Sequence, residues 1–471
     1  MAERHTPSLC RTLCSAPKRL YQEAGLSSLY SSSLDVKILC FQRFVRQFAY
    51  GQSTLILVPF FNELGVSQAK IGLCMTLTFA GDILTSFFLT IFADGIGRRL
   101  TLACGAALMI GSGITFGMAE NYWILLAAAI LGVISPSGNE VGPFRVLEES
   151  ALAHLTDAQQ RTHIYAWYSL IGTSGAAIGI LSCGWVIQHL HHDREWSYMA
   201  AYRLIFHVYT GVGALKVLLA FLQSRAVEAD KPGAETTEPA AAQASNSETE
   251  PLLRSEDRTE RDTEAASLAQ PKKPWLRKGL VPQISPQSRA TLLILCLLFA
   301  LDSFASGLAP MSWVTYYFRS HFGIEDGQLG SIFFTTSIIA AFSSIVAASL
   351  ARRFGNVKTM VFTHMPSAVF LALIPFPSDV RVSTLFLILR SCTQSMDVAP
   401  RSAFLAAIVL PQERTAVLGV LSVVKTLAQS LGPLITGILS GSSLFWVSFV
   451  CAGSLKVCYD LGMLALFKSH K

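Results

Sequence analysis

Residues 92–100 read FADGIGRRL and lie between two apolar stretches, residues 69–93 and 100–117. Each stretch has about the 20 residues that a helix needs to cross the core of a bilayer. The segment between them ends in two adjacent arginines, Arg98 and Arg99, and positive charge is favoured on the cytoplasmic side of membrane proteins. The segment therefore predicts a short charged cytoplasmic turn between two membrane-spanning helices.

The composition of the whole chain favours the same class of protein. Of its 471 residues, 51% are hydrophobic and only 14% are charged, and its mean hydropathy is +0.45. A soluble protein carries about a quarter charged residues, so lipid is the expected main solvent. The net charge of +6 fits a positive-inside bias, and no basic patch interleaved with aromatic residues indicates nucleic-acid binding. The ten cysteines form no Cys-x-x-Cys pair, so we expect neither a disulfide framework nor a metal site, and no cofactor.

Twelve apolar stretches are long enough to be counted as membrane spans. A polar segment rich in Glu, Ala, Thr and Ser separates the sixth from the seventh, and its composition is typical of a disordered linker. The expected organisation is a cytoplasmic N-terminal tail (1–35), a six-helix bundle (36–224), a disordered cytoplasmic linker (225–289), a second six-helix bundle (290–467) and a cytoplasmic C-terminal tail (468–471). The expected spans are 36–60, 69–93, 100–117, 122–143, 163–190, 201–224, 290–316, 328–350, 358–376, 381–400, 416–439 and 443–467.

Loop charges predict the orientation. Positive residues concentrate in loops on one side of the predicted spans, whereas the opposite loops are short or mixed in sign. By the positive-inside rule, both termini and the linker face the cytoplasm. The positive loop residues are Arg98, Arg99, Arg161, Arg352, Arg353, Lys358 and Arg414.

The two groups of six spans repeat each other in sequence. Five matches occur in the same order in both halves, as expected for two parallel six-helix units related by an axis along the membrane normal. They are FAYG at 48–51 with FASG at 304–307; Gly72 and Gly97 with Gly330 and Gly355; EVGP at 140–143 with DVAP at 397–400; Arg161, Gly179 and Gly184 with Arg414, Gly432 and Gly437; and GALKV at 213–217 with GSLKV at 453–457.

The stretch FADGIGRRL resembles the loop 2–3 signature of the major facilitator superfamily, G-x-x-x-D-x-x-G-R-R, with Thr90 where that pattern has its first glycine. The resemblance covers the chain outside the linker and the N-terminal tail. GNEVGPF and SMDVAPRSA also resemble a little-studied fungal and microbial branch of the superfamily. The resemblance implies an all-α membrane protein with twelve transmembrane helices in two pseudo-symmetric six-helix bundles, working as a secondary transporter.

Ionisable residues inside spans are candidates for function. Arg46, Asp82, Asp302 and Arg390 lie near the midplane of their spans, about 15 Å deep at the helical rise of ~1.5 Å per residue. The resemblance implies that helices 1, 4, 7 and 10 line a central cavity, so that Arg46, Asp302 and Arg390 face it. Further candidates for substrate contact are Gln47, Gln52 and Trp313.

Arg46 and Asp302 occupy equivalent positions in the two halves and carry opposite charge. Our hypothesis is that they approach each other across the cavity and that substrate or a proton exchanges with this pairing. The alternative is a permanent ion pair that only makes two buried charges tolerable. Arg390 is the candidate for gripping an anionic group, because a guanidinium binds carboxylate bidentately; its alternative role is to pair with Asp302 in place of Arg46.

A second set of residues is expected to control a cytoplasmic gate. In the superfamily an acid near the end of helix 4 can pair with the loop 2–3 arginines, so the resemblance implies a latch between Glu140 and Arg98 or Arg99, with Asp94 and Gly97 forming the turn. In the second half Arg352 replaces the signature acid, and Asp397 can satisfy Arg352, Arg353 or Arg401. Lys216 and Lys456 are interpreted as snorkelled or paired lysines, the latter with Asp460 one turn on.

The predicted function is secondary active transport of a small organic solute by alternating access, as proton-coupled efflux. Uptake or facilitated diffusion of a metabolite is one alternative, and a transporter-like sensor or scaffold that signals through its linker is another. No Walker A sequence and no nucleophile–base set is present, so neither ATP-driven transport nor an enzyme is expected. The expected partners are the small-molecule substrate, protons and the lipid bilayer, and the chain is expected to be a monomer.

The predicted linker contains one sorting motif. Glu248, Leu252 and Leu253 fit an acidic dileucine signal, E-x-x-x-L-L, which a sorting adaptor would read. The motif favours a vacuolar or lysosome-like membrane; the plasma membrane is the alternative.

Overall fold

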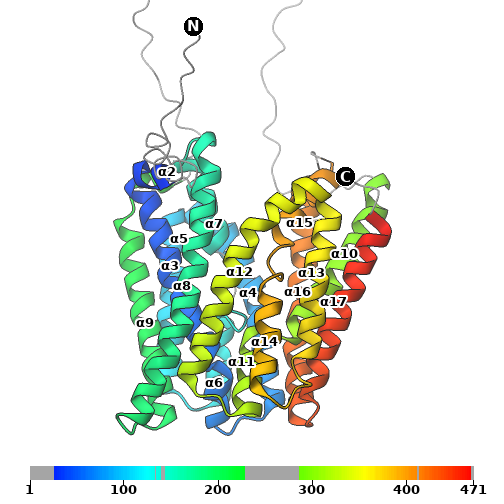
Figure 1. Cartoon of the computed structure of the whole chain (residues 1–471). Coiled ribbons are helices and arrows are strands. Elements are labelled where there is room, and N and C mark those ends of the chain that lie inside the picture. Colours follow the sequence, from blue (N-terminus) through cyan, green and yellow to red (C-terminus); the bar gives the residue numbers. More distant parts are fainter. Residues whose placement is uncertain (1–25, 133, 139–143, 229–285, 411–412, 468–471) are drawn as a thin grey trace, which may run out of the picture. The chain divides into compact units, whose positions relative to one another are not determined.

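The computed structural model describes residues 26–132, 134–138, 144–228, 286–410 and 413–467, and all regular structure in these ranges is helical. The described residues of both halves belong to one compact unit. Its long helices run along a common direction (Figure 1).

Each half consists of helices that follow the predicted spans. The first half contains α2 (Leu26–Ser31), α3 (Leu34–Glu63), α4 (Gln68–Ile96), α5 (Arg98–Met118), α6 (Tyr122–Leu131), α7 (Phe144–Leu155), α8 (Ala158–His192), α9 (Tyr198–Leu222) and the 3₁₀ helix η1 (Arg225–Val227). The second contains α10 (Pro286–Leu308), α11 (Met311–Phe322), α12 (Asp326–Phe354), α13 (Asn356–Leu373), α14 (Val380–Ser391), α15 (Val398–Ile408), α16 (Arg414–Gly441) and α17 (Phe445–Phe467).

Three predicted spans are interrupted, and the expectation of one continuous helix was wrong for them. The span predicted over 122–143 ends as a helix at Leu131, just before a stretch that contains Gly, Pro and Ser. The span at 290–316 breaks before Pro310, which has no backbone N–H to continue the helix. The span at 381–400 divides into α14 and α15. The fourth and tenth spans, which are equivalent in the repeat, are thus both broken.

Six helical segments of the described chain are long and apolar enough to cross a membrane on length and composition alone. The count covers only the described residues, so it is not a count of the spans of the whole chain. The helix α3 is not among the six, and Gln42, Arg46 and Gln52 are all buried within it. These polar side chains lower the hydropathy of the helix although they face the inside of the bundle.

The packing of equivalent glycines confirms the internal repeat. A Cβ added to Gly51 of α3 would overlap the carbonyl oxygen of Ala176 in α8, and one added to Gly307 of α10 would overlap that of Gln429 in α16. Small residues of this kind allow two helices to approach closely. The same close helix pair is therefore built twice, from equivalent positions of the two halves.

Glycines also join the two halves to each other. Gly72 of α4 meets Gly437 of α16, and Gly184 of α8 meets Gly330 of α12, in two contacts that are equivalent in the repeat. Near these glycines, the side chain of Gln68 donates a hydrogen bond to the Tyr316 hydroxyl. We call this region the closed end, because the two halves pack backbone against backbone there.

The turn at FADGIGRRL has the backbone conformation that its glycine predicts. Gly97 has φ 102° and ψ 146°, and its equivalent Gly355 has φ 85° and ψ 160°. Side chains rarely tolerate this region, so only glycine fits without strain. The Glu228 carboxylate accepts hydrogen bonds from the backbone N–H groups of Arg98 (2.6 Å) and Arg99 (3.3 Å), which caps the start of α5.

Candidate functional site

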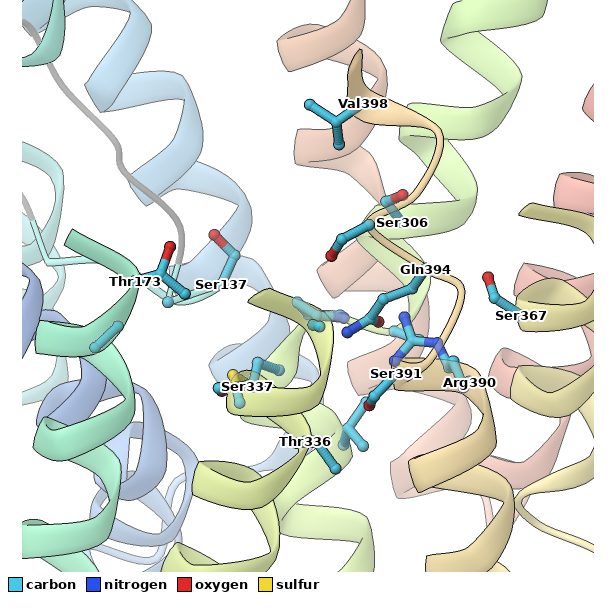
Figure 2. A pocket seen from close by; sticks show the side chains of 18 of the residues that line it. Ser137, Thr173, Ser306, Thr336, Ser337, Ser367, Arg390, Ser391, Gln394 and Val398 are labelled. Carbon is cyan, nitrogen blue, oxygen red and sulfur yellow. The ribbon is translucent and has the colours of Figure 1, made fainter. Parts of the chain in front are cut away.

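A cavity of about 620 Å³ lies between side chains of both halves, a size typical of small-molecule sites. The first half contributes residues of α3 and α8, Arg145 of α7 and the segment at 137–138, and the second half contributes most of the wall. Figure 2 shows several hydroxyl groups facing this space. The uncharged polar residues of the wall are Gln47, Ser137, Thr173, Ser306, Thr336, Ser337, Ser367, Ser391, Gln394, Ser395 and Gln429.

Arg390 lies at the last turn of α14, on the cavity wall beside Ser391 and Gln394 (Figure 2). Within the described part of the chain it forms no ion pair, although the pairs of the neighbouring charges are formed. A guanidinium without a counter-ion inside a bundle of helices is costly to bury. An anion in the cavity would remove that cost, so Arg390 has the chemistry of an anion-binding group.

Asp302 of α10 also lines the cavity, and two cations from other helices hold it. Lys456 of α17 donates hydrogen bonds to Asp302 Oδ1 (2.7 Å) and to the Ser306 hydroxyl (2.7 Å). Arg401 Nη1 of α15 lies 3.3 Å from Asp302 Oδ2. The two cations at these distances compensate the charge of the buried carboxylate.

The network continues on both sides of Asp302. Arg401 also pairs with Asp397, one of the three alternatives expected for that acid. His364 of α13 places Nε2 3.9 Å from Asp302 Oδ1 and Nδ1 3.0 Å from both carboxylate oxygens of Asp460. The expected pair between Lys456 and Asp460 does not form, because each residue has a partner on another helix. We call these six residues (Asp302, His364, Asp397, Arg401, Lys456 and Asp460) the Asp302 cluster.

The first half contains a second group of charges, the Arg46 cluster: Arg46, Phe144, Glu148, Tyr168 and Lys216. The two terminal nitrogens of Arg46, Nη1 and Nη2, donate to the carboxylate of Glu148, with Nη2–Oε2 at 2.9 Å. Both side chains are fully buried. The Tyr168 hydroxyl donates to the same carboxylate at 2.5 Å. Lys216 Nζ lies 3.7 Å from the ring centroid of Phe144, which is a cation–π contact. Arg46 and Glu148 do not line the cavity.

The structure contradicts the predicted approach of Arg46 to Asp302. Arg46 is paired with Glu148 of its own half, and Asp302 with Lys456 and Arg401 of its own half. Each charge finds a partner on a neighbouring helix of the same bundle, so neither has to reach across the cavity. The alternative in which Arg390 pairs with Asp302 is not formed either.

The remaining substrate candidates divide into two groups. Gln47 lines the cavity. Asp82, Gln52 and Trp313 are buried and do not line it. Trp313, for example, packs edge-to-face on Phe445 with the ring centroids 5.7 Å apart, so it is part of the core at the closed end.

The described gate residues have partners within the first half. Arg98 donates to the Ser150 hydroxyl (2.9 Å) and Arg99 to the carbonyl oxygen of Phe221 (2.9 Å). Glu140, their expected partner, lies outside the described residues, as do the side chains of Asp94 and Arg352; the side chain of Arg353 is exposed. The sorting motif of Glu248, Leu252 and Leu253 also lies outside them.

Sequence reasoning missed Glu148, His364 and Asp460 as site residues. Glu148 was placed in a loop, because the fourth span was drawn to residue 143 and the helix α7 was not foreseen. His364 lies inside the predicted span 358–376, so the rule that singled out Asp302 would have found it too.

Comparison with known proteins supplies the family. The family model described as Major Facilitator Superfamily matches residues 39–310 and 292–469. The uncharacterized membrane protein YJR124C of Saccharomyces cerevisiae is 35% identical over 444 residues, which cover 93% of this chain and 94% of the yeast protein. The multidrug resistance protein MdtH of Yersinia pestis is 26% identical over 151 residues, or 32% of this chain and 36% of MdtH.

Among solved structures, the chain is similar to a bacterial homolog of the human lysosomal transporter Spinster, in an inward-facing and occupied conformation. That structure has a TM-score of 0.65 at 14% identity and covers 92% of this chain and 96% of its own. At this identity the likeness shows the fold alone. It supports the arrangement of two six-helix bundles expected from the repeat.

Proposed function

The chain belongs to the major facilitator superfamily and is a membrane transporter, and from this premise we propose that it carries a small, hydrophilic organic anion by alternating access. Its family and structural neighbours point to a transporter rather than an enzyme. The observation that supports an anion is Arg390, a cavity-lining guanidinium without an ion pair among the described residues.

The rest of the wall supports a hydrophilic solute. Eleven wall residues carry hydroxyl or amide side chains, which can donate and accept hydrogen bonds, beside apolar residues such as Met311 and Phe333. A small hydroxy acid or a sugar phosphate offers both an anionic group for the arginine and oxygens for the hydroxyl groups. A bulky apolar drug would leave most of these polar groups without partners, at a cost for each.

Packing between the halves supports alternating access. The two halves touch through glycines at the closed end, where Gly72 meets Gly437 and Gly184 meets Gly330. Contacts of this kind, made by backbone and small residues, can separate when one half rocks against the other. We propose that a proton gradient drives the cycle, with both termini in the cytoplasm and the chain working as a monomer in a vacuolar, lysosome-like or plasma membrane. A sorting adaptor at the dileucine motif belongs to the same proposal.

The proposal is tested by binding measurements on the full chain in detergent. The probes are gluconate, citrate and glucose 6-phosphate, with glucose and choline as a neutral and a cationic comparison. We expect at least one anion to raise the unfolding temperature and the other two classes to leave it unchanged. Arg390→Gln should weaken anion binding about 30-fold, equivalent to about 2 kcal/mol for a hydrogen bond to a charged group.

A matched control is available on the same helix. Arg381 lies at the exposed start of α14, away from the cavity, so Arg381→Gln should bind the anion like the unaltered chain. Equal binding by the Arg390→Gln and unaltered chains would contradict the proposed anion site. A response to choline but to none of the anions would contradict the substrate class.

Efflux is a second candidate for the direction of transport. It is favoured by the relatives named multidrug resistance protein, although the match spans only 32% of this chain. Flux of the same anion in right-side-out and inverted proteoliposomes, with and without a pH gradient, separates efflux from uptake. A flux that is independent of the pH gradient would contradict proton coupling.

A further inference from the structure

His364 stands out among the cavity-lining charges because it lies between two carboxylates. Its Nε2 faces Asp302 at 3.9 Å, and its Nδ1 is 3.0 Å from both oxygens of Asp460. A neutral imidazole has one N–H and no charge, whereas an imidazolium can donate to Asp460 and also attract the Asp302 carboxylate by its charge. The histidine side chain is 5% exposed, yet it forms part of the cavity wall.

Charged and titratable groups surround His364 from each packed helix. The helix α17 contributes Lys456, Tyr459 and Asp460, with the Tyr459 ring centroid 6.0 Å from that of the imidazole. The helices α10, α14 and α15 contribute Asp302, Arg390 and Arg401, and Asp397 lies directly before α15. The helix α12 presents the hydroxyl groups of Thr336 and Ser337 to the cavity.

We propose that His364 is the group that takes up and releases the transported proton. The proposal rests on the proposed function, because it assigns the coupling residue of the same cavity. The imidazole gains a proton from cavity water and returns it to cavity water after the halves have rocked. The cavity provides the access, and Asp460 holds the ring in both states.

Asp302, the acid singled out by the sequence, is a less suitable proton carrier. Lys456 and Arg401 both bind its carboxylate, so its protonation would break two charge-assisted contacts. Protonation of His364 breaks none of the contacts described and strengthens those to Asp302 and Asp460. The geometry therefore assigns Asp302 a positioning role, as the anion that holds Lys456, Arg401 and His364 together.

The same arrangement bears on whether the proton and the anion move together or in exchange for each other. An anion bound at Arg390 adds negative charge to the cavity wall that contains His364, which favours the imidazolium. By linkage, the protonated histidine then favours the anion to the same extent. Proton and anion therefore bind together and cross together, which favours cotransport over exchange of one for the other.

The experiment measures proton binding directly, so it needs no identified substrate. Proteoliposomes of the full chain on a solid-supported membrane receive a jump from about pH 8 to about pH 6, the range in which an imidazole titrates. The expected result is a transient charge displacement in the unaltered chain and its loss in His364→Gln. His207→Gln is the control, because His207 is exposed on α9 and outside the cavity wall.

A second variant guards against a folding defect in His364→Gln. Asp460→Asn keeps the imidazole but removes one carboxylate, so a charge displacement should remain in this variant, in contrast to His364→Gln. Full displacement in His364→Gln, no displacement in the unaltered chain, or the same loss in Asp460→Asn as in His364→Gln would each overturn the proposal. These outcomes are independent of anion binding at Arg390, which tests the proposed function.

Discussion

Each half of the chain buries a cluster of charged residues, and the two clusters differ in whether they reach the cavity. In the first half, Arg46 and Glu148 are fully buried and form a closed bidentate pair away from the cavity. In the second half, Asp302 shares Lys456 and Arg401, and all three line the cavity. One cluster is complete in itself, whereas the other is joined to the space where a solute can bind.

The two halves share one helical frame but carry different charges on it. Gly51 and Gly307 pack in equivalent ways, and Gly97 and Gly355 share an unusual backbone conformation, so the frame of the two halves is the same. The charges placed on that frame differ. We interpret the Arg46 cluster as a structural element of the first half, whereas Asp302, Arg401 and Lys456 of the Asp302 cluster face the cavity.

The largest effect is expected from breaking the closed pair. Glu148→Gln leaves the Arg46 guanidinium buried beside a neutral side chain, and loss of one partner of a buried ion pair costs about 3–5 kcal/mol. The measurement is the free energy of unfolding of the purified chain in detergent. Glu149→Gln is the matched control, because this neighbour is partly exposed and pairs with Arg145 at the surface. Equal stability of the two variants would contradict the structural role of the Arg46 cluster.

A smaller loss of stability, with complete loss of transport, is expected in the second half. Asp302→Asn removes the central carboxylate, but Arg401 keeps Asp397 and Lys456 keeps the Ser306 hydroxyl. We expect a cost of about 1–3 kcal/mol, the range for hydrogen bonds to charged groups, and no pH-driven transport in proteoliposomes. A variant that transports normally, or that unfolds as readily as Glu148→Gln, would remove the distinction between the clusters.

An effect of similar size on stability, with no loss of a charge, tests the shared frame. Gly97→Ala and Gly355→Ala each force a side chain into a backbone region that is essentially restricted to glycine, at about 1–3 kcal/mol. Gly97→Ala should cost more, because the new Cβ would also press on the Glu228 carboxylate. Gly111→Ala, in the middle of α5 with open space around it, is the control and should not destabilise the chain. A neutral result at Gly97 would show that the turn is not constrained as described.

Much of the frame could be predicted from the sequence, because it depends on local patterns. The lengths of the apolar stretches predicted most of the helices. The order of the short sequence matches predicted that Gly51 and Gly307, and likewise Gly72 and Gly330, would occupy equivalent positions in the two halves. The breaks in the fourth and tenth spans were not predicted, since both stretches are apolar enough to pass for one helix.

The candidate site was predicted only in part. Asp302, Arg390 and Gln47 were singled out and do line the cavity, because a polar residue in an apolar span must face protein or water. Their partners were not found. Glu148, Lys456 and His364 are far from Arg46 and Asp302 in sequence, and nothing in local spacing shows which helices will be neighbours.

By itself, then, the sequence determined the class of protein, the two repeated halves and the glycine turn at FADGIGRRL, since hydropathy, internal matches and backbone sterics act over short stretches of chain. Only the tertiary structure decided which charges meet. Arg46 and Asp302 hold equivalent places in the repeat, yet each is neutralised within its own bundle, because a buried charge pairs with whatever opposite charge the packing brings within reach.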